Sequence, residues 1–190
     1  MKHTFINYFK STLYLLVFAG FGTVYAGSYD DFFHAVLNDQ PAPVKRLLAR
    51  GFDANTLDPK GLHGLYIALR EPSLKVAQVL VDWPKTDVNK TGWTPLHYAA
   101  TNGHVHVMNL LLEHHAYIDA ESPNGTTPLM MAAHYGTAAG VKLLLEAGAD
   151  PTLRNQLGMT AIDFANKASR TDAAELIAAR QRSRQPRGKW

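Results

Sequence analysis

The stretch that decides the fold is Gly92-Trp93-Thr94-Pro95-Leu96-His97-Tyr98-Ala99-Ala100-Thr101-Asn102-Gly103-His104. Thr94 is a residue type that caps helices, and Pro95 stands at the first helical position, where the missing backbone N–H is not needed. A second apolar run, from Met108 to Leu112, follows the turn. The stretch therefore predicts two short antiparallel helices joined by a turn.

The same pattern recurs along the chain at a nearly constant spacing. Alanines that align in register are separated by 33, 31, 33 and 33 residues. They are Ala35, Ala68, Ala99, Ala132 and Ala165, and the aligned glycines are Gly61, Gly92, Gly125 and Gly158. One such unit cannot bury its own apolar face, so several units must stack. The sequence therefore predicts an all-α solenoid of five stacked helix-turn-helix units.

Each unit supplies the side chains that stacking needs. The alanine pair of the first helix is small enough to let neighbouring units approach closely. Leucine pairs on the second helix place apolar bulk between the layers, and they are Leu47-Leu48, Leu80-Val81, Leu111-Leu112 and Leu144-Leu145. Gly51 and Gly148 follow two of these helices and can adopt the left-handed backbone that ends a helix. The chain has no cysteine, so its stability has to come from packing and not from disulfides.

These residues resemble the ankyrin repeat. Thr127-Pro128-Leu129, followed by Ala132-Ala133 and Gly136, repeats the pattern one unit later. The resemblance covers residues 28 to about 180 and implies helix pairs with short β-turn fingers between them. It divides a domain of residues 27–180 into repeats 28–57, 58–88, 89–121, 122–154 and 155–180. The first and last repeats are degenerate, as terminal capping repeats are in this family.

Three departures from the pattern make the middle of the stack its least regular part. Asn89 precedes Gly92 by three residues where the equivalent spacing elsewhere is six, which predicts a short finger between repeats two and three. His63-Gly64 replaces the Thr-Pro pair in repeat two and predicts a weaker helix cap. His115 stands where repeats one and four have glycine, and a non-glycine residue in the left-handed conformation costs on the order of 1 kcal/mol.

Residues 1–26 predict a cleaved signal peptide. Two lysines precede an uncharged stretch that ends in Val24-Tyr25-Ala26, with small residues at the spacing a signal peptidase requires. The apolar part is shorter than the roughly 20 residues of a membrane-spanning helix. We therefore expect the mature protein to begin at Gly27, in the periplasm of a bacterium and without stable membrane insertion. An uncleaved N-terminal anchor is the alternative.

The basic side chains gather at the C-terminus. The whole chain has a net charge of +3, but five of its basic side chains lie within residues 180–190, and the remaining mature chain is mildly acidic. Residues 181–190 alternate arginine with small or polar residues, which predicts a basic, disordered tail. Contact with anionic lipid or an envelope polymer is one use of such a tail, whereas nucleic acid is a poor partner for an exported protein.

The sequence contains no arrangement of residues for catalysis or for binding a cofactor. It has no Gly-x-Ser-x-Gly elbow, phosphate loop or cysteine–histidine pair. Repeats three and four hold most of the histidines, namely His97, His104, His106, His114, His115 and His134. His104 and His106 are two residues apart and do not form the i, i+4 pair of a helical zinc site. The resemblance marks His97 and His104 as structural. From the missing motifs and the histidine spacing together, we expect no enzymatic activity, no cofactor and no metal.

The resemblance also implies where a partner binds. Partners of ankyrin-repeat proteins usually meet the concave face, which is formed by loop residues beside the repeat glycine and by the exposed end of each first helix. The matching positions are Lys60, Leu62, Arg70 and Glu71 in repeat two, Lys90, Thr91, Trp93, Thr101 and Asn102 in repeat three, Asn124, Thr126, His134 and Tyr135 in repeat four, and Gln156, Met159 and Lys167 in repeat five. Arg70, Trp93 and Tyr135 are the expected anchors, because arginine and aromatic side chains dominate interface energies. Packing of Trp93 and Tyr135 over neighbouring repeats is the alternative.

The expected function is protein–protein interaction by a monomeric periplasmic module. An immunity or inhibitor protein that neutralises a toxin or enzyme in the same compartment is the alternative among binding functions. A metal-handling protein that uses the histidines of repeats three and four is the alternative of another class. The sequence does not name the partner, because specificity in this fold lies in side chains on a common scaffold.

Overall fold

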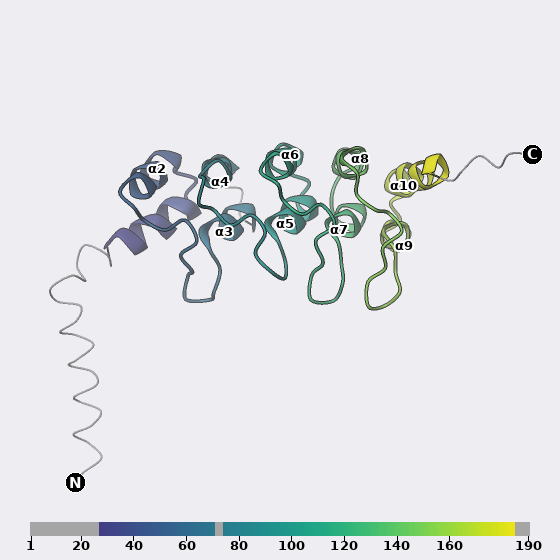
Figure 1. The fold of residues 1–190 in the computed structure, drawn as a ribbon, viewed down its shortest axis with the longest axis horizontal. Helices are drawn as coiled ribbons and strands as arrows, with labels where there is room; N and C mark the ends of the chain where they lie inside the picture. Colours follow the sequence, from purple (N-terminus) through teal and green to yellow (C-terminus); the bar gives the residue numbers. More distant parts are fainter. Residues whose placement is uncertain (1–26, 71–73, 185–190) are drawn as a thin grey trace, which may run out of the picture.

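The computed structural model describes residues 27–70 and 74–184, which form five antiparallel helix pairs stacked side by side (Figure 1). The predicted leader, 1–26, and residues 185–190 lie outside the described residues. The pairs are helix 27–37 with α2 (Pro41–Ala49), α3 (Gly64–Arg70) with α4 (Leu74–Val81), α5 (Pro95–Thr101) with α6 (Val105–Glu113), α7 (Pro128–His134) with α8 (Ala138–Ala147), and α9 (Ala161–Lys167) with α10 (Thr171–Arg184). The prediction of an all-α stack of five units is confirmed.

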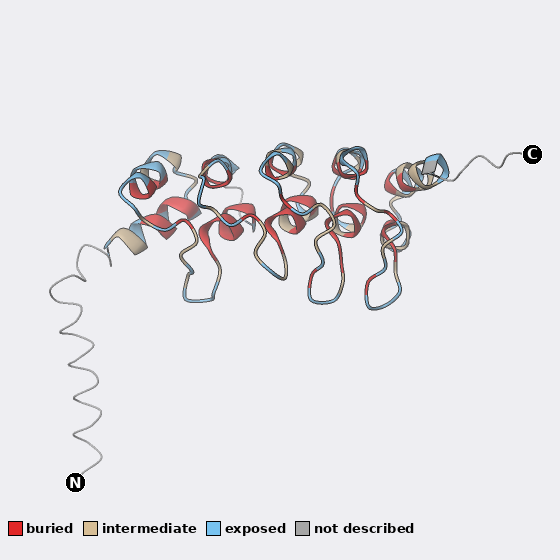
Figure 2. Cartoon of the chain, in the orientation of Figure 1, coloured by how far each residue is buried: buried red, intermediate tan, exposed pale blue. Residues whose placement is uncertain are grey.

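The helices form two layers, and four fingers project from the inner one. α3, α5, α7 and α9 pack on one another in the inner layer, while α2, α4, α6, α8 and α10 form the outer layer (Figure 1). Burial is concentrated in the inner layer and on the inward faces of the outer helices (Figure 2). Ala99 and Ala132 are completely buried, as are Leu111 and Leu144. The alanine and leucine positions therefore make the core that the repeat pattern predicts, although Leu112 is only partly buried.

The inner helices begin at the predicted threonines. Thr94 and Thr127 are the N-cap residues of α5 and α7, each with extended backbone and each followed by proline. Thr160 is the N-cap residue of α9. The Asp163 carboxylate accepts hydrogen bonds from the Thr160 backbone N–H at 2.8 Å and from the Thr160 hydroxyl at 2.7 Å. The bond from the backbone N–H is the main reason why the pKa of Asp163 lies below its ordinary value.

Asparagine side chains connect the segments that follow successive outer helices. The Asn55 side chain donates to the carbonyl of Lys85 at 2.7 Å and accepts from the N–H of Asp87 at 2.8 Å. One repeat later, Asn89 donates to the carbonyl of His115 at 2.9 Å and accepts from the N–H of Tyr117 at 2.8 Å. Asn55 and Asn89 thus play the same part, so the residues missing between Asn89 and Gly92 come out of the finger itself. Figure 1 shows this second finger to be the shortest, as predicted.

The helix ends confirm the predicted left-handed positions. Gly51 and Gly148 have φ of 93° and 107°, values that favour glycine. His115 has a φ of 62°, so it adopts the same left-handed region without being glycine. Repeat three therefore carries the backbone strain that its sequence predicts.

The disorder expected for residues 181–190 is wrong for residues 181–184. α10 continues without a break to Arg184, and the Gln181 side chain donates to the carbonyl of Pro151 at 3.4 Å. Alanine, glutamine and arginine all have high helix propensity, so the helix of repeat five runs on past the last buried residue, Ile177. None of the described helices is both long and apolar enough to cross a membrane.

Candidate functional site

The predicted partner-binding positions lie on the fingers and on the inner helices or at their ends, except Glu71, which lies outside the described residues. We call this surface the finger-side face, and it comprises the four fingers, the exposed side chains of α3, α5, α7 and α9, and those of helix 27–37 (Figure 1).

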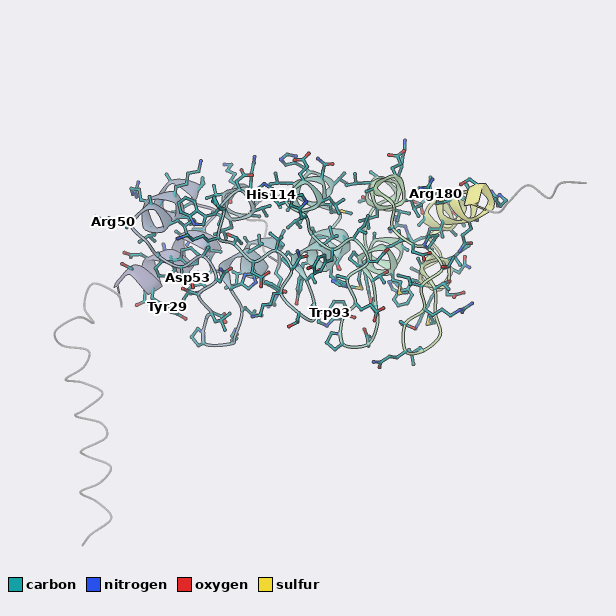
Figure 3. The ribbon with its side chains drawn as sticks, in the orientation of Figure 1. Tyr29, Arg50, Asp53, Trp93, His114 and Arg180 are labelled. Carbon is teal, nitrogen blue, oxygen red and sulfur yellow. The ribbon has the colours of Figure 1, made fainter. Side chains whose placement is uncertain are left out.

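In repeat three, Trp93 stands on a buried histidine. Its ring meets that of His97 edge to face, with centroids 5.4 Å apart and planes at 74°, and Trp93 keeps part of its surface exposed. Figure 3 shows Trp93 on the finger side of the stack. The indole is therefore held by packing on one side and is open to a partner on the other.

His97 itself is a structural link between repeats three and four. Its Nδ1 accepts from the backbone N–H of Thr94 at 3.1 Å, and its Nε2 donates to the carbonyl of Thr126 at 2.8 Å. Burial lowers the pKa of His97 to about 4, so the ring is neutral at neutral pH. The structural role that the resemblance implied for His97 is confirmed.

In repeat four, His134 and Tyr135 form an aromatic ridge. Their ring centroids are 4.0 Å apart, and His134 also meets Phe164 of repeat five at 6.1 Å with planes at 75°. Tyr135 is 59% exposed, while the Nδ1 of His134 is buried without a hydrogen-bond partner among the described residues. The phenol is thus available to a partner and the imidazole supports it.

Two of the predicted asparagines have intramolecular partners. The Asn102 side chain donates to the carbonyl of Leu69 in repeat two at 2.6 Å. The Asn124 side chain accepts from the Ser122 hydroxyl at 2.6 Å, and its backbone carbonyl accepts from the N–H of Gln156 in the next finger at 3.0 Å. Both asparagines stabilise the shape of the finger-side face. These intramolecular hydrogen bonds leave fewer of their donors and acceptors for a partner.

Lys90 and Met159 lie at the sides of the fingers and are partly buried. Lys90 is close enough to His63 for its charge to help lower the pKa of that histidine, after the larger effect of burial. Met159 pairs with Asn155 through backbone and side-chain hydrogen bonds across its finger. Both residues contribute part of their surface to the finger-side face.

Lys60, Leu62 and Arg70, which were predicted in repeat two, line a groove at the N-terminal end of the stack. The repeat 1–2 groove has a volume of about 390 Å³ and lies between helix 27–37 and α3 with its finger. Its lining includes Tyr29, Phe33 and Leu37 from the first helix and Lys60, Leu62, Ile67 and Arg70 from repeat two. The Tyr29 hydroxyl donates to the carbonyl of Leu57 at 3.1 Å, which ties the first helix to the finger.

Tyr29, Phe33 and Leu37 are functional-site candidates that the family positions did not include. The positions that the resemblance implied belong to repeats two to five, and none of them lies in the first repeat. A signal was nevertheless present, because Leu37 follows Ala35 by two residues just as Arg70 follows Ala68. Leu37 is 55% exposed, an unusual state for a leucine beside a core.

The expected anchors are distributed along the stack and do not form a cluster. Among the described residues, no hydrogen bond or ring contact joins Arg70, Trp93 and Tyr135 to one another. Each belongs to a different repeat, so a partner that contacts all three must extend along the finger-side face.

The histidines are not gathered into a metal site in the part of the chain that is described. Within residues 27–70 and 74–184, no group of three or more histidine, cysteine, aspartate or glutamate side chains could hold a metal ion. His114 instead lies 3.4 Å from the Asp82 carboxylate of the preceding repeat.

Comparison with known proteins agrees with the geometry. Residues 32–122 match the family described as "Ankyrin repeats (3 copies)", and residues 111–165 match "Ankyrin repeats (many copies)". The chain belongs to the ankyrin-repeat family. Ankyrin repeats generally mediate protein–protein interaction, and the related proteins are typically interaction modules without enzymatic activity.

Three curated relatives of this ankyrin-repeat chain are much longer proteins from Mus musculus. Ankyrin repeat and SAM domain-containing protein 6 of Mus musculus is 38% identical over 104 residues, which are 53% of this chain and 12% of that protein. Neurogenic locus notch homolog protein 1 of Mus musculus is 30% identical over 144 residues, or 73% of this chain and 6% of that protein. Nuclear factor NF-kappa-B p105 subunit of Mus musculus is 38% identical over 101 residues, or 50% and 10%. The chain thus spans only a small part of the length of each relative.

Proposed function

We propose that the protein is an exported, non-catalytic module that binds a protein partner on its finger-side face. The observation that carries this proposal is the distribution of open side chains over a rigid scaffold. The rings of Trp93 and Tyr135 pack against those of His97 and His134, respectively, and both side chains retain exposed surface. A pre-ordered aromatic side chain loses little conformational entropy on binding, which favours its use as an anchor.

The periplasm is the proposed site of action. Val24-Tyr25-Ala26 after a short apolar stretch supports export, and the absence of cysteine suits an oxidising compartment. A bacterial source is part of this proposal. The ankyrin stack then acts as a monomer that presents one continuous face to its partner.

The test is a comparison of binding and stability in one variant. Trp93→Ala is expected to weaken capture of the partner by about 2 kcal/mol or more while it leaves the melting temperature nearly unchanged. The partner is first isolated by affinity capture from the periplasmic fraction and identified by mass spectrometry. Affinity is then measured by titration calorimetry and stability by thermal unfolding.

The matched control is Tyr117→Ala, which removes an exposed aromatic ring outside the predicted partner-binding positions. It is expected to change neither quantity. A Trp93→Ala protein that melts earlier but binds with unchanged affinity per folded molecule would show that the indole is a packing residue.

A further inference from the structure

We propose that the repeat 1–2 groove receives an extended segment of the protein partner in which a large apolar side chain stands next to an acidic one. This inference rests on the proposed function and names the chemistry that the N-terminal end of the face recognises. It depends on the apolar floor of the groove and on the position of its charges.

The floor of the groove is apolar and already ordered. Phe33 and Ile67 are 8% and 9% exposed, so they are fixed in the core and present only an edge. Leu37 beside them is 55% exposed, so a bound segment can bury apolar surface on it. A volume of about 390 Å³ is that of a small binding pocket and accommodates one or two large side chains of a bound segment.

The charges divide the groove into two different ends. Leu37 and Arg70 occupy equivalent positions near the C-terminal ends of adjacent parallel helices, so Arg70 lies at the Leu37 end. Asp30 and Asp58 lie at the finger end, together with Lys60. The Asp58 carboxylate accepts the backbone N–H groups of Lys60 and Leu62, both at 2.8 Å, and is therefore part of the turn.

Arg70 is the group that selects the charge of the ligand. It is exposed, and among the described carboxylates none forms an ion pair with it. A guanidinium presents paired N–H donors that match a carboxylate in geometry and charge. An apolar side chain resting on Leu37 and Ile67 therefore brings an adjacent acidic side chain to Arg70.

The experiment is a methyl NMR titration of the purified protein with short capped peptides. The probe is acetyl-Ser-Leu-Glu-Ser-amide, and the controls replace Glu by Gln or Leu by Ser. Saturable shifts of the Leu37 and Ile67 methyl groups are expected with the probe. The Gln peptide should bind about threefold to fivefold more weakly, as for an exposed ion pair, and the Ser peptide should give no saturable shift.

Two arginine variants isolate the charge effect. Arg70→Gln is expected to abolish the preference for Glu over Gln, whereas Arg50→Gln, at an exposed arginine outside the groove, should preserve it. Equal binding of the Glu and Gln peptides to the unmodified protein, or shifts that do not saturate at Leu37 and Ile67, would overturn the proposal. Shifts of the same methyl groups that depend on protein concentration without peptide would overturn it in favour of a second copy of the chain.

The outcome is separable from that of the proposed function. A partner whose capture depends on Trp93, together with no peptide binding at Leu37, would remove the groove and leave the finger-side face in place.

Discussion

At the scale of single residues, two buried histidines in neighbouring repeats differ in the hydrogen bonds of their ring nitrogens. His97 has a hydrogen bond at each ring nitrogen. His63 is only 1% exposed, and neither of its ring nitrogens has a hydrogen-bond partner among the described residues. It occupies the capping position where repeats three and four have threonine, and its ring packs against Tyr66 with centroids 4.2 Å apart. Burial lowers the pKa of both histidines to about 4, so both rings are neutral in the folded protein at neutral pH.

These two histidines predict a loss of stability in mild acid. Their pKa in the unfolded chain is 6.5, so between pH 6.5 and about 4 the unfolded state binds more protons than the folded state. The free energy of unfolding should therefore be highest above pH 6.5 and fall as the pH drops toward about 4, with each histidine contributing up to roughly 1.4 kcal/mol per pH unit. Urea unfolding measured across this range checks the slope.

His63→Thr, which restores the residue type found in the other repeats, should make that slope shallower. His106→Thr, at an exposed position, is the matched control. A slope that neither His63→Thr nor His97→Gln alters would contradict the assignment of these two rings as neutral groups that resist protonation.

At the scale of the helix, the ends of the outer helices depend on a left-handed residue. Gly51 and Gly148 supply it in repeats one and four, while His115 supplies it in repeat three with a φ of 62°. The carbonyl of His115 accepts from the Asn89 side chain, so the strained conformation also places a link between the segment after α4 and the end of α6.

His115→Gly should therefore stabilise the protein. Glycine reaches this φ without the steric cost that a Cβ imposes, so the free energy of unfolding should rise by up to roughly 1 kcal/mol. Gly51→Ala should do the reverse, because a Cβ at Gly51 would meet no atom within 4 Å and only the backbone strain remains. Chemical denaturation of both variants checks this opposition, and a destabilised His115→Gly would show that the imidazole makes contacts worth more than the strain.

At the scale of the whole molecule, stability is built by stacking neighbours. Inner helices pack on adjacent inner helices and outer helices on adjacent outer ones, from α2 through α10. The completely buried Leu111 lies on α6, in the middle repeat of this series. A defect there separates two halves of the stack that each retain two repeats.

Leu111→Ala should cost roughly 2 to 5 kcal/mol, because the truncated side chain leaves a cavity. The unfolding curve should shift to lower denaturant or split into two transitions. Leu157→Ala, at a leucine that is 79% exposed, is the control and should leave the curve in place. An unchanged midpoint for Leu111→Ala would be incompatible with the packing described.

The proposed export is also tested on the whole chain. The proposal of a cleaved leader predicts that N-terminal sequencing of protein from the periplasmic fraction begins at Gly27. Membrane-bound protein that still begins at Met1 would replace the periplasmic module with an anchored one.

The repeat pattern predicted the helix pairs, their stacking in a row of five, and the strained left-handed backbone at His115. These features follow from residues close together in the chain, since caps, turn glycines and apolar spacing act locally and the repetition reinforces them. The helix at residues 181–184 was not predicted, because the alternating arginines of this segment suggested disorder. Its glutamine and arginines also have high helix propensity, which favours the continuation of α10. Arg70, Trp93 and Tyr135 were placed by family positions, but the sequence did not indicate that Arg70 shares a groove with Tyr29 and Leu37. That groove exists only because helix 27–37 packs beside α3 and its finger. The contacts between these two repeats decide which side chains line the groove and where its charged groups lie.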